Sequence, residues 1–372
     1  MSLVYSEDDR MLADTAEEFL LSKSPVAAQR TLRDSKSALN FDNDVWQQMV
    51  ELGWTAITFP EKLGGLEFGY KGLGAVFESM GKHLTASPLL SSVVLCGSLL
   101  EQLANDSQLE WLNHIISGEK RLALAIDEKA RHEPFNFQTE AVDVADGFVL
   151  SGKKVMVMDG LSADGWVVSA KHKEGVSLFI VPFSEDVIVK RTNLVDSRNY
   201  AELTFNELTL PVNALLGNPG DSIDAINHSL DLGRLCLSSE ILGASKALFD
   251  MTVEYLKTRE QFGVKIGTFQ ALQHRAANCY VELELAQSCV IAALSNADDT
   301  KSDLGLSASL AKCQVSKAAD LITREAIQMH GGIGVTDELD IGLYLKRIRV
   351  AQMSLGDADF HQARYGELKN KM

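Results

Sequence analysis

A block of strand-like segments lies between two long helical regions, and this order constrains the fold more than any other feature of the chain. Between Arg121 and Pro211, Gly, Asp and Asn separate short stretches rich in β-branched and aromatic residues, such as GFVLSGKKVMVM and AELTFNELTL. Such spacing predicts a small antiparallel β-domain. In the flanking regions, apolar residues recur at helical intervals.

The helical period after the strand block predicts helices over residues 222–257, 269–295, 303–330 and 338–352. Runs of helices and strands that do not alternate are typical of an α+β protein. We therefore expect three domains along the chain. They are an N-terminal helical domain (1–120), a middle antiparallel β-domain (121–218) and a C-terminal helical bundle (219–372).

Charge and cysteine usage narrow the class of protein. A net charge of −16 disfavours binding to nucleic-acid phosphates and to anionic membranes. The apolar stretches are far shorter than the ~20 residues of a membrane-spanning helix. Five dispersed cysteines without CxxC spacing are typical of reduced thiols, and the acidic N-terminus does not resemble a signal peptide. We expect a cytoplasmic protein that binds neither nucleic acid nor membrane.

The stretch TREQFGVKIGTFQALQH contains charged, aromatic and amide side chains that a connection between two helices does not require. It holds Arg259, Phe262, Gly263, Gly267 and Gln270 between two predicted helices. Each residue has a structural explanation, because a cation complements a helix C-terminus, an aromatic can fill a core and glycines form turns. An arginine fork can equally bind a phosphate group.

A second stretch, AIQMHGGIGVTDE, ends a predicted helix with Gln328 and His330 and continues with Gly331, Gly332 and Gly334. One glycine is enough to end a helix. Further glycines let the backbone or phosphates of another molecule approach closely. A metal site at His330 is disfavoured because no partner ligand stands at the required spacing.

Taken together, the two stretches and the order of helices and strands resemble the FAD-dependent acyl-CoA dehydrogenase family. LGWTAITFPEKLGG and LTLPVNALLG resemble family segments at the N-terminus and at the exit of the β-domain, so the resemblance covers nearly the whole chain. It implies a four-helix bundle in the C-terminal domain. It also implies α,β-dehydrogenation of an acyl-CoA thioester, with an electron-transfer flavoprotein as the electron acceptor.

The resemblance assigns roles to residues of both stretches. Arg259 and Phe262 correspond to residues that contact the ADP half of FAD, and Gln270 lies close by. The second stretch would reach the same FAD from a neighbouring subunit through Gln328, Gly331 and Gly332. The family pattern therefore implies a dimer or tetramer, either homo- or hetero-oligomeric, in which subunits share the cofactor.

The usual catalytic glutamate is missing from both positions where the family carries it. One position is Leu355 and the other is Gly233. Asp357 and Glu240 are the nearest acids that could replace it. Asp357 can instead be a helix N-cap, and Glu240 can be a buried or interface carboxylate.

Two contacts to the flavin ring also depart from the family pattern. The segment LALAIDEKARHEP places Asp127 and Glu128 where members carry a Thr-Glu-Pro-Gly-rich loop. Met158, in MVMDG, replaces a hydroxyl residue. The ADP-binding stretches thus persist while the ring contacts and the base are absent.

Three interpretations follow. The chain is one subunit of a heteromer with a base-bearing paralogue, as in members that act on steroid or dicarboxylyl thioesters; it most resembles partner subunits such as the small subunit of pimeloyl-CoA dehydrogenase. Alternatively, it is a self-sufficient, diverged enzyme with a relocated acid. As a third possibility, it is a scaffold that binds FAD or acyl-CoA without turnover.

Overall fold

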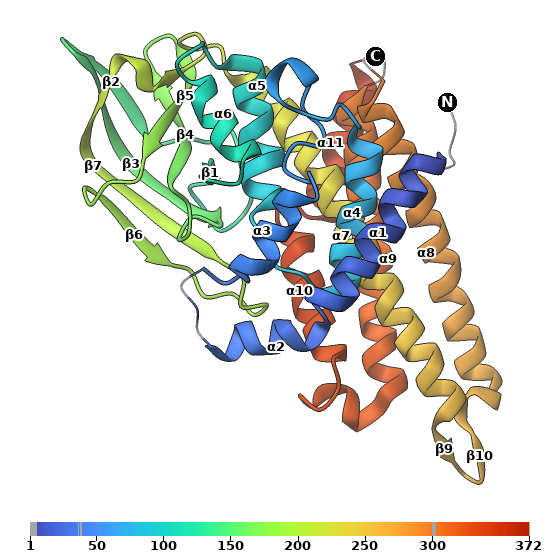
Figure 1. Cartoon of the computed structure of the whole chain (residues 1–372). Coiled ribbons are helices and arrows are strands. Elements are labelled where there is room, and N and C mark those ends of the chain that lie inside the picture. The colour runs from blue at the N-terminus through green and yellow to red at the C-terminus, as the bar shows by residue number, and fades with distance from the viewer. Residues whose placement is uncertain (1–5, 36, 38, 300–302, 372) are drawn as a thin grey trace. The chain divides into compact units, whose positions relative to one another are not determined.

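The computed structural model describes residues 6–35, 37, 39–299 and 303–371. The predicted order of helices, strands and helices is confirmed (Figure 1). The N-terminal helices are α1 Glu7–Lys23, α2 Val26–Ser35, α3 Asn43–Glu51, α4 Tyr70–His83, the π-helix Leu89–Gly97, α5 Ser98–Leu103 and α6 Leu109–Ile116. The C-terminal helices are α7 Ile223–Thr258, α8 Gln270–Ala297, α9 Leu304–His330, α10 Ile341–Met353 and α11 Ala358–Asn370.

A single eight-stranded sheet forms the β-region. Its strands are β1 Leu122–Ala125, β2 Glu140–Val144, β3 Gly147–Met158, β4 Gly165–His172, β5 Gly175–Pro182, β6 Val187–Arg191, β7 Tyr200–Pro211 and β8 Leu215–Leu216. The strand order is β6-β7-β3-β2-β4-β5-β8, and β1 pairs with β4. The expected antiparallel arrangement is wrong at two places, because both β1 and β2 pair with β4 in parallel. The pairing of β1 follows from the long connection between β1 and β4, which a hairpin does not provide.

Close packing divides the chain into two compact units that differ from the three expected domains. One unit contains residues 1–30, 70–85 and 234–372, and the other contains residues 31–69 and 86–233. The helical unit therefore includes α1 and α4 from the N-terminal region. The boundaries 1–120, 121–218 and 219–372 describe the order of elements and remain a prediction as domain limits.

Two glycines fix α4 against α7 within the helical unit. A Cβ atom at Gly81 would lie 2.0 Å from the Glu240 carbonyl oxygen, and one at Gly243 would lie 1.8 Å from the Glu78 carbonyl oxygen. No side chain fits at such a separation. Both positions therefore require glycine, and the two helix backbones meet directly.

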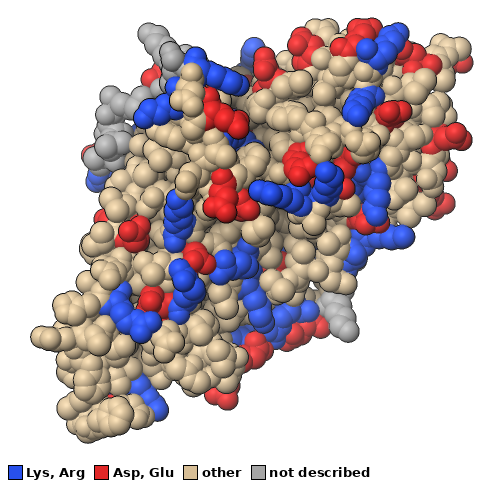
Figure 2. All heavy atoms as spheres, turned by 180° about the vertical axis from the view of Figure 1, so that it is seen from behind, with Lys and Arg blue, Asp and Glu red and all other residues tan. Residues whose placement is uncertain are grey.

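The surface carries charges of both signs. Figure 2 shows Lys and Arg side chains interspersed with Asp and Glu over the face it presents. Among the described residues, no helix has the length and apolar character needed to cross a membrane.

Candidate functional site

The first stretch forms a tight hairpin at the end of α7. Strands β9 (Glu260–Gln261) and β10 (Val264–Lys265) pair antiparallel, with Phe262 and Gly263 as the two-residue loop (Figure 1). Both loop residues have positive φ, 56° and 78°, as a type I′ turn requires. An aromatic residue in this conformation is strained. Phe262 is 90% exposed and contacts only the edge of Phe269 among the aromatic rings of the described residues, so the alternative that it fills a core is wrong.

Arg259 is held by its backbone and not by its side chain. Its N–H donates to the Tyr255 carbonyl and its carbonyl accepts from the Ile266 N–H, both at 2.9 Å. The side chain is exposed, and among the described residues no carboxylate forms an ion pair with it. Gln270 is the first residue of α8 and is also exposed. The corner therefore presents a guanidinium, an aromatic ring and an amide to the outside.

The second stretch forms an open turn after α9. Gly331 has φ 64° and ψ −143°, which glycine alone adopts readily. A Cβ atom at Gly332 would meet no atom within 4 Å, so the packing of this chain does not require glycine there. Gln328 is exposed in the last helical turn. The turn thus offers backbone groups and free space to another molecule.

The two stretches lie side by side on one chain. The rings of Tyr255 and His330 stack with centroids 4.3 Å apart, and the Tyr255 hydroxyl donates to the His330 carbonyl at 3.4 Å. Beside this stack, Leu256, Ile266 and Met329 form a buried cluster. The expected division, in which the two stretches reach one FAD from different subunits, remains a prediction. One chain presents both.

Glu240 is engaged in an ion pair inside the helical unit. Its two carboxylate oxygens accept from Nε and Nη2 of Arg347 at 2.7 and 2.9 Å, and both side chains are buried. The alternative that Glu240 is a buried carboxylate is therefore confirmed. Proton abstraction by Glu240 would first require that this pair be broken.

Asp357 is the N-cap of α11. Its side chain accepts a hydrogen bond from the Phe360 N–H at 2.8 Å, as the N-cap interpretation predicts. The usual base position, Leu355, lies two residues earlier with φ 58°. The other base position, Gly233, is a buried residue within α7.

Three buried cationic or imidazole side chains surround the turn that holds Leu355. Lys312 Nζ donates to the carbonyls of Gln352 and Gly356 at 2.9 and 3.0 Å. The Leu355 carbonyl accepts from Arg234 Nε at 3.0 Å and contacts His361 Nε2 at 3.1 Å. Burial lowers the pKa of Lys312 to about 7 and also lowers the pKa of His361.

The cluster of Lys312, Arg234 and His361 was not predicted from the sequence. Its one sequence signal is the single lysine in the small, apolar stretch ASLAKCQV, on a helix whose neighbours are buried.

In the β-region, the loop that follows β1 occupies the position that contacts the flavin ring in the family pattern, and it forms hydrogen bonds within itself. The Asp127 carboxylate contacts His132 Nδ1 at 2.8 Å and accepts from the Glu133 N–H at 3.1 Å. The Asp127 carbonyl accepts from the Val155 N–H at 2.8 Å. The Asp127 carboxylate is therefore bonded within its own loop and its carbonyl is bonded to β3, and Met158, at the end of β3, provides no hydroxyl.

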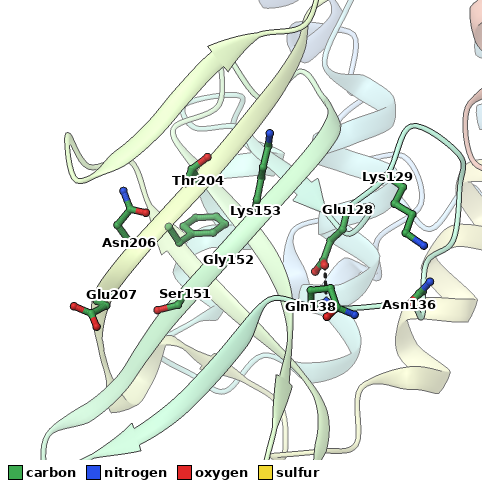
Figure 3. A pocket seen from close by; sticks show the side chains of 11 residues that line it. Glu128, Lys129, Asn136, Gln138, Ser151, Gly152, Lys153, Thr204, Asn206 and Glu207 are labelled. Carbon is green, nitrogen blue, oxygen red and sulfur yellow. Dashed lines mark hydrogen bonds between the residues drawn. The ribbon is translucent and has the colours of Figure 1, made fainter.

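Next to Asp127, Glu128 anchors the rest of this loop. It accepts from the Thr139 N–H at 3.0 Å, from the Gln138 N–H and from the buried Lys154 Nζ at 2.7 Å. Figure 3 shows Glu128 pointing toward Gln138 at the edge of a pocket of about 810 Å³ between this loop and strands β3 and β7. The pairing of Glu128 with Lys154 was not predicted, although the adjacent lysines of SGKKV are a sequence signal for it.

Comparisons with known proteins agree with this architecture. Residues 6–119 match the model for the acyl-CoA dehydrogenase N-terminal domain, and residues 220–366 match the model for the C-terminal domain. The chain is 27% identical over 375 residues to the bovine mitochondrial short-chain specific acyl-CoA dehydrogenase, covering 97% of this chain and 90% of the relative. It is 26% identical over 385 residues to the caffeyl-CoA reductase–Etf complex subunit CarC of Acetobacterium woodii, covering 97% of each.

A solved structure described as the Tcur3481–Tcur3483 steroid ACAD G363A variant has the same fold. It superposes with a TM-score of 0.88 at 27% identity and covers 98% of each chain. The helical domain, central sheet and helical domain expected from the sequence are therefore confirmed.

Proposed function

Because this chain belongs to the acyl-CoA dehydrogenase family, an FAD-dependent oxidoreductase family, we propose that it acts as one subunit of a heteromeric acyl-CoA dehydrogenase whose base-bearing partner is a paralogue. One observation carries the proposal. The residues that the family resemblance assigns to the ADP half of FAD are present and exposed, whereas those at the positions for the flavin ring and the catalytic base are changed.

The ADP-binding part is supported by the groups that the chain leaves open. Arg259 offers several parallel N–H donors, which match the geometry of a pyrophosphate. Gly331 and Gly332 leave room for close approach of a phosphate or ribose. Phe262 offers a flat apolar ring that is 90% exposed and has an edge contact with Phe269.

Three residues support the proposal that this chain lacks the flavin-ring contacts and the base. Leu355 cannot accept a proton. Asp127 is closed into its own loop. Met158 has no hydroxyl to donate to a flavin. A bound FAD would supply the hydride acceptor for the β-hydrogen of the thioester, and the α-proton would have to go to a base. In this proposal the partner provides that base.

The comparisons support a heteromer of this kind without fixing its members. The steroid ACAD structure is described by two component names. The relative from A. woodii is described as a subunit of a complex with Etf. We propose an electron-transfer flavoprotein as electron acceptor and a cytoplasmic location. A steroid or dicarboxylyl thioester as substrate, and kinship with the small subunit of pimeloyl-CoA dehydrogenase, are parts of the same proposal.

The experiment begins with the chain purified alone. Its visible absorption spectrum is recorded, and acyl-CoA thioesters are added without oxygen while flavin bleaching is followed. We expect no bleaching with the chain alone, and bleaching when it is co-expressed with a paralogue that carries the glutamate. Bleaching of the chain alone would instead establish a self-sufficient enzyme, and Asp357→Asn and Glu240→Gln would then identify its base. Flavin bound by the mixture but never reduced would favour a scaffold.

A further inference from the structure

The stacked pair Tyr255 and His330 joins two segments that are 75 residues apart in the sequence. Tyr255 lies one turn before Arg259 and accepts the Arg259 N–H at its carbonyl. His330 is the last residue of α9, directly before Gly331. Tyr255 therefore supports the stretch that holds Arg259, and His330 supports the stretch that holds Gly331.

His330 is itself held in one orientation. Its Nδ1 lies 2.8 Å from the Ala326 carbonyl, an arrangement in which Nδ1–H donates. Burial lowers the pKa of His330, which keeps the ring neutral. On the other side, a Cβ atom at Gly334 would lie 2.9 Å from His330 Cβ, so the chain beyond the glycine turn packs directly on this residue.

From this geometry we propose that Tyr255 and His330 are positioning residues for the cofactor. Their stack fixes the Arg259 corner and the Gly331–Gly332 turn in one relative position before FAD binds. Neither ring is required to touch FAD. Preorganisation raises affinity because the free energy of ordering the two segments is spent during folding and not during binding. This inference rests on the proposed FAD site.

The test uses the full chain in its flavin-bearing assembly, alone if it is yellow and with the paralogue if it is not. The dissociation constant of FAD is measured by titrating the deflavinated protein, and the melting temperature is measured on the same samples. Tyr255→Leu removes the ring, whereas Tyr255→Phe keeps it. We expect Tyr255→Leu to weaken FAD binding about threefold to tenfold, the range of an aromatic pair, and Tyr255→Phe to stay within about twofold of the native protein.

A matched control separates positioning from general loss of stability. Phe249→Leu removes another aromatic partner on α7, one whose ring lies 6.2 Å from that of Tyr280; both residues lie outside the two stretches in sequence. It should lower the melting temperature while the FAD dissociation constant stays native. If Tyr255→Leu does not fold, His330→Leu and His330→Phe repeat the test from the other side, with weakened binding expected for leucine only.

Native FAD affinity in the folded leucine variants would overturn the inference and leave the proposed function standing. Equal weakening by Phe249→Leu would also overturn it, because the effect would then follow stability alone. If neither the native chain nor its mixture with the paralogue binds FAD, the proposed function fails and the inference fails with it.

Discussion

Glu240 and Arg347 form a two-point ion pair inside the helical unit, with N–O distances of 2.7 and 2.9 Å. Removal of one member of a buried pair leaves the other charge without compensation, which costs about 3–5 kcal/mol. Glu240→Gln should therefore lower the free energy of unfolding by about this amount, measured by urea denaturation. Glu78→Gln, which disrupts a more exposed pair with Lys246, is the control and should cost about 1 kcal/mol or less. A Glu240→Gln variant of native stability that has lost turnover would show that Glu240 is the base.

Leu355→Glu tests whether the base is the only missing part of the active site. The new carboxylate would lie in a turn that Lys312 and Arg234 support, and nearby cations favour the charged form. We expect a folded protein that still does not bleach with acyl-CoA when purified alone, because Asp127 and Met158 remain unsuited to the flavin ring. Leu355→Gln serves as the uncharged control. Bleaching by the glutamate variant alone would mean that a single side chain separates this chain from an independent enzyme.

Phe262→Asn should separate cofactor binding from stability. Asparagine followed by glycine is a preferred type I′ turn, so relief of the strained φ at Phe262 should offset the lost edge contact with Phe269. The melting temperature should stay close to native or rise, while FAD binding weakens measurably in titrations. Val212→Asn, at another exposed apolar position, should change neither quantity. Unchanged FAD affinity in Phe262→Asn would remove the ring from the proposed site.

Lys312 predicts a particular dependence of stability on pH. Burial lowers its pKa to about 7, below its ordinary value of 10.5, so between these values the unfolded chain binds a proton that the folded chain does not. Stability from this group must therefore rise as the pH increases through that window, and it is lowest below it. Lys312→Met should flatten the rise relative to the native protein in urea midpoints measured at several pH values. Since Lys154, with its pKa lowered to about 8 by burial, contributes in both proteins, the difference between the two curves isolates Lys312. Parallel curves would mean that Lys312 stays charged when buried.

The sequence predicted the elements well because their signals are local. The end of α9 at Gly331 and the N-cap at Asp357 each depend on residues within a few positions, whereas the hairpin at Phe262 and Gly263 was not predicted. The parallel pairing of β1 with β4 was missed because strand direction depends on the path of a connection and not on side-chain periodicity.

The candidate site was less predictable because its determinants are tertiary. Helical spacing alone could not show that Glu240 faces Arg347, which lies 107 residues away. The same limit applies to Lys312, whose partners are main-chain carbonyls that carry no sequence signal. Residues that bind a ligand stand out in sequence, whereas residues that hold the binding segments in place, such as Tyr255 and His330, look like ordinary helix residues.

The glycine contacts between α4 and α7 limit how far this chain can be recombined with its relatives. Gly81 and Gly243 place two backbones so close that neither helix tolerates a side chain at the crossing. A chimera that exchanges residues 219–372 for those of another protein would keep α4 from this chain and receive a foreign α7. Such an exchange can succeed only if the donor helix also has a residue without a side chain at the position of Gly243, so these two distant segments are constrained to evolve together.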